Sequence, residues 1–291
     1  MNKEVCKKFQ DLTTNLEYDS NTKNYKFKDD KDFIQYCTDG KCEENIDKIN
    51  AVCLFLFNEL FGNSTAFSFI AKGNTNIVEY IMILLSYMLN FKKIEENYTI
   101  KNFYEAYINN DNGYITDINN VSGYKNYKDL IDKKEDLMSI YVKDMSKFYY
   151  VFTLLCMMYV EFDEKRPTCY RFSEIAKEFA KKYDELNENY NNGKDSPYNK
   201  LLSTLSNDYC NLKNKCNDPE FSNFPSLPTY SRRLIIKRTL IPIAFIFVVV
   251  SIFFGIAYKY SLFGFRKRSQ KQCLREKIKN IKKKLIINKL F

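Results

Sequence analysis

Apolar side chains recur every three or four residues in several stretches of this chain, which is the spacing that places them on one face of an α-helix. Such stripes run through residues 77–88, 148–159, 172–186 and 198–212. We find no convincing run of alternating apolar and polar residues that would predict strands. The pattern therefore predicts an all-α fold, in which the apolar stripes of several helices form the core of one domain.

One stretch is apolar on every side. Residues 240–258 are 19 consecutive residues without a charge, and as a helix they would span about 28 Å, close to the hydrocarbon thickness of a bilayer. The competing interpretation is a buried core helix. Residues 148–160 are too short for a span and residues 77–91 are interrupted by Glu79, so both are expected in the core. The sequence thus predicts a single transmembrane helix near the C-terminus.

Charge is distributed unevenly around this helix. The net charge is +9, but residues 259–291 hold 12 basic residues against one acid, and four more basic residues lie within residues 232–238. Residues 1–231 hold 29 basic and 35 acidic residues, a net charge of −6. The positive-inside rule then places the tail in the cytosol and residues 1–235 outside. The mildly acidic bulk of the chain argues against nucleic acid as a partner.

These features divide the chain into four parts. They are a helical ectodomain at residues 1–217, a short proline-containing stalk at 218–239, the transmembrane helix at 240–258 and a basic cytoplasmic tail at 259–291. The first nine residues contain no apolar stretch of the signal-peptide type, so we expect export to rely on the late helix or on another route. The sequence therefore predicts that the protein is anchored in a membrane.

Eight of the nine cysteines precede the transmembrane helix and one follows it. An even set outside and a single cytosolic cysteine is the distribution expected of disulfides formed in an oxidising compartment. The disulfide candidates are Cys6, Cys37, Cys42, Cys53, Cys156, Cys169, Cys210 and Cys216. Eight cysteines allow about 105 pairings, and the sequence does not choose among them. Buried free thiols in a reducing compartment are the alternative.

The sequence gives little support for an enzyme or for a metal site. The chain contains no histidine, which removes the commonest general base, zinc ligand and activator of a nucleophile. The short cysteine spacings within residues 37–42 and 210–216 do not match paired zinc ligands. There is no phosphate-binding loop and no G-x-S-x-G motif. We therefore expect a non-catalytic protein with no cofactor and no metal site.

The tail carries an amphipathic pattern. Its apolar residues step by four, three and four positions from 274 to 285, and lysines and arginines fill the other faces. This pattern is typical of a basic helix that lies on an anionic membrane leaflet; a flexible tail whose charge only fixes the topology is the alternative. The residues expected to face lipid are Arg266, Lys267, Arg268, Leu274, Ile278, Ile281 and Leu285. Cys273 is a candidate for palmitoylation.

Several segments together resemble a known family. They are MNKEVCKKF (1–9), DKINAVCLFLFNELFG (47–62), NIVEYIMILLSYMLN (76–90), YKDLIDKKEDLM (127–138), YNKLLSTLSNDYCNLKNKC (198–216) and YKYSLFGFRKRSQKQCLREKIKNIKKK (258–284). The chain resembles the PIR (Plasmodium interspersed repeat) proteins of malaria parasites, in particular their rodent-parasite branch. The resemblance covers essentially the whole chain, and its most specific part is SLFGFRKRSQKQ.

The resemblance implies a variant parasite protein of a multigene family, with a helical ectodomain containing cysteines, one C-terminal membrane helix and a basic cytoplasmic tail. Such proteins are associated with infected red cells and with immune evasion or host interaction. A host-cell surface protein is then the implied partner, at the infected-cell surface or the vacuolar membrane. The alternative is a structural protein of an intracellular or parasitophorous vacuole membrane. Cys210 looks additional to the family pattern, so no disulfide map is carried over.

Overall fold

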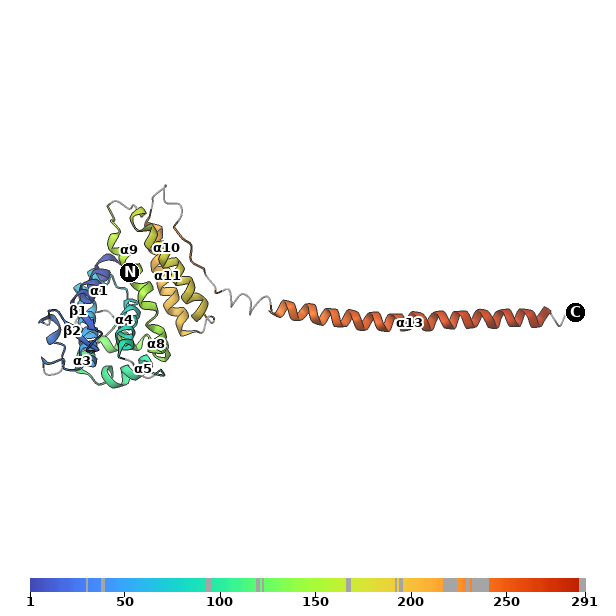
Figure 1. Ribbon diagram of the computed structural model, residues 1–291, viewed down its shortest axis with the longest axis horizontal. Coiled ribbons are helices and arrows are strands. Elements are labelled where there is room, and N and C mark those ends of the chain that lie inside the picture. The colour runs from blue at the N-terminus through green and yellow to red at the C-terminus, as the bar shows by residue number, and fades with distance from the viewer. Residues whose placement is uncertain are drawn as a thin grey trace. The chain divides into compact units, whose positions relative to one another are not determined.

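A computed structural model of the chain forms two compact units, Met1–Ser231 and Arg232–Phe291. It describes residues 1–29, 31–37, 40–92, 96–118, 121, 123–165, 169–191, 193, 196–216, 224–228, 231 and 241–287. The first unit is a helical domain with a small hairpin, and the second contains one long helix (Figure 1). The expected fold class, a helical domain followed by one apolar C-terminal helix among the described residues, is confirmed.

The domain is built from long helices joined by short helical turns. The long helices are α1 (Lys3–Asn15), α3 (Asn45–Phe61), α4 (Ile77–Phe91), α9 (Phe148–Glu161), α10 (Ser173–Tyr190) and α11 (Pro197–Lys215). The shorter ones are α2 (Lys31–Ile34), η2 (Ala66–Ile70), α5 (Ile100–Phe103), η3 (Tyr104–Ile108), α6 (Asn112–Ile115), α7 (Tyr127–Asp132), η4 (Glu135–Ser139), α8 (Val142–Met145) and η5 (Tyr170–Phe172).

Helices α4 and α9 form the centre of the domain. Helix α4 packs against α3, α8 and α9, while α9 also contacts α1, α10 and α11. Both apolar runs that were expected in the core are therefore buried there, with Phe148 and Leu155 fully enclosed. Each apolar side chain of this size that leaves water contributes about 1.5–3 kcal/mol to folding. Figure 1 shows α10 and α11 side by side along one side of the domain, next to α9.

Local hydrogen bonds fix the start of the chain onto this core. The Asn2 side-chain oxygen accepts a hydrogen bond from the backbone N–H of Val5 at 3.1 Å, which caps the N-terminus of α1. The amide nitrogen of Asn2 donates to the carbonyl oxygen of Ile70 at 2.8 Å. One side chain thus satisfies an orphan N–H of α1 and also ties this helix to η2.

A two-stranded antiparallel hairpin follows α1, and the sequence patterns did not predict it. Strand β1 (Leu16–Asp19) pairs with β2 (Asn24–Phe27). Its turn is closed by Asp19, whose carboxylate accepts hydrogen bonds from the N–H groups of Asn21 and Thr22 at 2.9 and 3.3 Å. The two strands alternate apolar and polar residues, but with four residues each they leave too short a signal to read.

The segment expected to be a stalk belongs in part to the domain. Of residues 218–239 the structure describes 224–228 and 231, and these pack on the helices. Phe224 is 7% exposed and meets the ring of Tyr209 at 5.0 Å between centroids. The Tyr209 hydroxyl donates to the Pro225 carbonyl at 2.8 Å, and the hydroxyl of the buried Ser231 donates to the Asn191 carbonyl at 3.3 Å. We call residues 224–228 together with Ser231 the strap.

The second unit is described from Ile241 onward. Helix α13 (Ile241–Ile287) runs 47 residues without interruption, so the apolar segment and most of the basic tail form one helix. Of the two alternatives for the tail, a helix or a flexible segment, the described part is helical.

Candidate functional site

Disulfides tie distant parts of the domain together, and all nine cysteines lie within the described residues. Cys6 of α1 is bonded to Cys156 of α9, 150 residues apart in sequence, with 5.0 Å between Cα atoms. The two other disulfides are Cys37–Cys42 and Cys169–Cys216, with separations of 5 and 47 residues. The first fastens the N-terminal helix to the centre of the core, and the last fastens the end of α11 to the turn that precedes α10.

The expectation of eight paired cysteines is corrected at two positions. Cys53 and Cys210 are free thiols in the structure, as is Cys273 in the tail. Cys53 lies on α3 in the core, where burial raises the pKa of its thiol to about 12. Cys210 lies on the solvent-exposed side of α11. The two side chains cannot meet because one is enclosed by the core and the other faces solvent.

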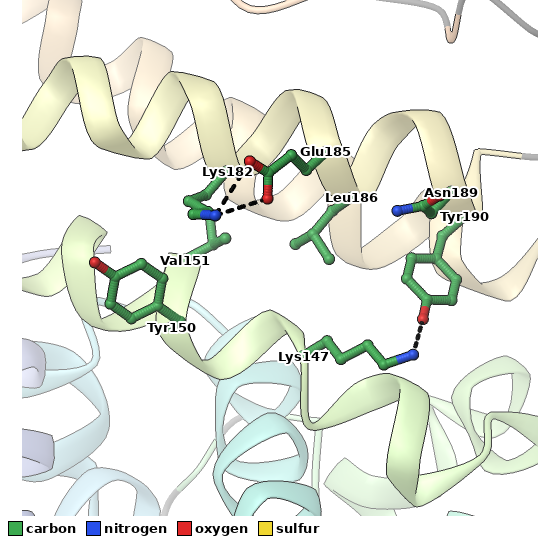
Figure 2. Close-up of a pocket in the computed structure, with 8 residues that line it drawn as sticks. All are labelled: Lys147, Tyr150, Val151, Lys182, Glu185, Leu186, Asn189 and Tyr190. Atoms are coloured by element: carbon green, nitrogen blue, oxygen red, sulfur yellow. Dashed lines mark hydrogen bonds and ion pairs between the residues drawn. The ribbon is translucent and has the colours of Figure 1, made fainter.

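A groove of about 600 Å³ lies between α9 and α10 (Figure 2). We call it the α9–α10 groove. Figure 2 shows the rings of Tyr150 and Tyr190 at its opposite ends, with the Lys182–Glu185 pair between them on the α10 side. Its lining consists of Lys147, Tyr150, Val151, Lys182, Glu185, Leu186, Asn189 and Tyr190.

The charged groups of this groove are engaged with one another. Lys182 donates to both carboxylate oxygens of Glu185, at 3.1 and 2.8 Å. Lys147 donates to the Tyr190 hydroxyl at 2.7 Å and to Asp144 at 2.9 Å. Burial alone would raise the pKa of Asp144, but hydrogen bonds from Lys147 and Tyr190 outweigh it and hold the pKa below its ordinary value. Each of these charged groups therefore has a partner within the protein.

One exposed aromatic ring lies at the edge of the groove. Tyr150 is 51% exposed, and an exposed tyrosine offers a large apolar face together with a hydroxyl, as at many protein interfaces. Polar and charged side chains surround it. Chemically, this arrangement suits non-covalent recognition of a partner.

Elsewhere in the domain, polar clusters serve the fold. Lys134 and Glu79 form a buried ion pair at 2.6 Å, and Lys134 also donates to Asn76 at 2.6 Å. Asp208 is buried and accepts hydrogen bonds from the Tyr80 hydroxyl at 2.7 Å and from the amino group of Met1. Within the part of the chain that the structure describes, no cluster of three or more Cys, Asp or Glu residues is placed to hold a metal ion.

The apolar C-terminal segment is long enough to cross a membrane. Among the described residues one helical window qualifies, Pro242–Lys259, with a mean hydropathy of 2.1 and none of its residues buried inside the protein. It coincides with the expected span at 240–258 within two residues. A buried core helix, the competing interpretation, would have its side chains enclosed, and here large apolar residues such as Phe254 are 72% exposed.

The tail beyond this window keeps an exposed apolar stripe. Leu274, Ile278 and Ile281 are 60%, 52% and 58% exposed. Lys267 and Arg268 are exposed on the same helix. The side chains of Arg266 and Leu285, which were also expected to face lipid, lie outside the described residues.

Two comparisons with known proteins point to the same family. The family model for the "Plasmodium variant antigen protein Cir/Yir/Bir" matches residues 6–259. A solved structure, described as that of a Plasmodium PIR protein ectodomain, matches with a TM-score of 0.59 and 32% sequence identity, and the match covers 79% of this chain and 97% of the other. No curated protein matches the chain.

Proposed function

The chain belongs to the Plasmodium variant antigen family Cir/Yir/Bir, and from this membership we propose that it is a membrane-anchored variant protein that displays its helical ectodomain for host interaction or immune evasion. In this proposal the domain Met1–Ser231 faces outward, the helix around Pro242–Lys259 spans the membrane and the basic tail lies in the cytosol. The ectodomain acts by non-covalent contact rather than by catalysis.

The observation that carries the proposal is the disulfide framework in the domain on one side of a single apolar helix. Disulfides persist in oxidising environments and are rare in the cytosol. The six bonded cysteines all precede the helix, and Cys273, which follows it, is free. The excess of basic residues after the helix supports the same orientation.

The two exposed thiols provide a direct test of this orientation. Cys210 lies on the surface of the ectodomain and Cys273 on the tail, so a membrane-impermeant maleimide distinguishes the two sides in intact infected cells. We expect labelling of Cys210 and none of Cys273 until the membrane is permeabilised. Cys210→Ser and Cys273→Ser variants assign each signal to its residue.

The other outcomes refute the proposal in distinct ways. Labelling of Cys273 alone would mean the reverse orientation. Labelling of neither thiol before permeabilisation would place the domain away from the cell surface and favour the alternative, a structural protein of an intracellular or vacuolar membrane. Thiol counting by mass in denaturant accompanies the experiment. We expect three alkylated cysteines without reduction and nine after it, because six are bonded in the structure.

Host contact itself is tested by binding of the ectodomain to host cells. The α9–α10 groove supplies a variant for this assay, Tyr150→Ala, and the chain supplies a matched control. Tyr170 is 75% exposed and does not line the groove, so Tyr170→Ala removes a comparable exposed ring elsewhere. Equal binding by both variants would exclude the groove, and absence of binding by the unaltered ectodomain to any host cell type would remove host contact from the proposal.

A further inference from the structure

The apolar residues of the tail form one narrow stripe along α13. At about 100° per residue, Leu274, Ile278 and Ile281 fall within about 60° of one another around the helix axis. All three are more than half exposed. Exposure of such a stripe to water is unfavourable, so we expect another surface to bury it.

Basic residues border this stripe on both sides. Lys271, Lys282 and Arg275 lie about 50–90° to one side of its centre, and Lys277 lies about 70° to the other side. All four are exposed. Glu276, the one acid after Tyr258, lies about 170° away, on the face opposite the apolar stripe. The helix therefore has an apolar stripe with basic residues on both sides of it. Its one acidic residue lies on the opposite face.

A second copy of the tail is a poor occupant for the stripe. The steps of four and three residues would suit a coiled coil with Leu274 and Ile281 at d and Ile278 at a. The adjacent e and g positions would then be Arg275, Lys277 and Lys282. Coiled coils pair opposite charges at these positions, whereas here Lys277 would face Lys282 of the second copy, which is repulsive, and no acidic residue would offset it. An anionic membrane leaflet complements the whole surface, because its acyl chains match the stripe and its headgroups match the flanking basic residues.

We propose that the tail helix docks on an anionic membrane leaflet, with Leu274, Ile278 and Ile281 entering the acyl boundary and the flanking lysines and arginine contacting lipid headgroups. The long stems of lysine and arginine allow their charged ends to reach the headgroups from beside an inserted stripe. Docking requires α13 to bend between the membrane span and Lys271. Gly264 lies in that interval, and glycine is among the weakest helix formers.

The test uses the full chain, reconstituted in nanodiscs of phosphatidylcholine with or without phosphatidylserine. In a Cys210→Ser/Cys273→Ser background, an environment-sensitive fluorophore is placed by Ile278→Cys on the stripe. Gln272→Cys is the matched control, because it lies about 150° from the stripe centre on the same exposed helix. Cys53 is buried and does not react in the folded domain.

In discs with phosphatidylserine we expect a blue-shifted emission at position 278 and a several-fold lower quenching by iodide than at position 272. High salt, or the triple variant Lys271→Gln/Lys277→Gln/Lys282→Gln, should abolish the difference. Equal quenching at both positions in anionic discs overturns the proposal. Protection at 278 that is the same in neutral discs overturns its electrostatic basis, and protection that rises with the number of chains per disc identifies a second copy as the occupant. The readout does not depend on a host ligand or on cellular orientation, so it fails independently of the proposed function.

Discussion

Removal of the Cys6–Cys156 disulfide should destabilise the domain Met1–Ser231 more than removal of Cys37–Cys42. A disulfide restricts the unfolded chain, and the effect grows with the logarithm of the loop that it closes. The loops are 150 and 5 residues long. The chain-entropy relation then gives about 5 kcal/mol for the long loop and about 2 kcal/mol for the short one. The expected difference in the free energy of unfolding is about 3 kcal/mol.

The third disulfide provides an intermediate point. Cys169–Cys216 closes 47 residues, which corresponds to about 4 kcal/mol by the same relation. Burial does not reverse the expected order, because Cys6 and Cys156 are 0% and 3% exposed. Alanine at these two positions therefore also removes packing contacts in the core, which adds to the loss of the cross-link.

The assay is guanidinium unfolding of residues 1–231 without reducing agent, comparing double cysteine-to-alanine variants of each pair. Cys53→Ala is the control, because it removes a buried sulfur that closes no loop, and it should cost about 1 kcal/mol. Equal losses for the three pairs would refute the loop-length reasoning. A loss in Cys53→Ala as large as that of the longest loop would show that packing, rather than chain restriction, accounts for the effect.

Three further predictions follow from buried groups. Lys134→Met should cost about 3–5 kcal/mol in denaturant unfolding, because Glu79 would remain buried without its partner at 2.6 Å; if Glu79→Leu/Lys134→Met is no more stable than the single variant, the reasoning fails. Phe224→Ala should cost about 3 kcal/mol and should speed amide exchange in the strap, whereas unchanged exchange there would mean that the ring does not hold the strap. Burial raises the pKa of Tyr149 and of Tyr183 to about 12, above the ordinary value of about 10. Unfolded tyrosines thus release protons first, so this contribution to stability is complete below about pH 10 and is lost as the pH rises toward 12; unfolding free energies that stay constant from pH 9 to about 12 would contradict it.

Helical periodicity located much of the fold. The stripes at 77–88, 148–159, 172–186 and 198–212 fall within helices α4, α9, α10 and α11, or begin one residue before them. The same patterns did not reveal α3. Eleven of its residues are buried, nearly all of them on one broad face of the helix, so an apolar face was present in the sequence here and was missed.

Polar residues in apolar surroundings were the hardest to interpret from sequence. Glu79 appeared only as an interruption of an apolar run, yet it is 1% exposed and its partner Lys134 lies 55 residues away. In the same way, the prolines and polar residues of 218–239 indicated a stalk, while Phe224 is enclosed by the domain. A signal existed in this segment, since aromatic residues among polar ones are candidate anchors.

The sequence by itself determined the features that depend on contiguous residues: the apolar span near 240–258, the basic tail that follows it and the helical class of the domain. Length, hydropathy and period are local properties, so they can be read before the chain folds. Only the tertiary structure decided which cysteines pair, because the partners of Cys6 and Cys169 are set by how helices pack across 150 and 47 residues. It also enclosed Cys53 in the core while leaving Cys210 in solvent, a difference that arises from which side of a helix meets its neighbours.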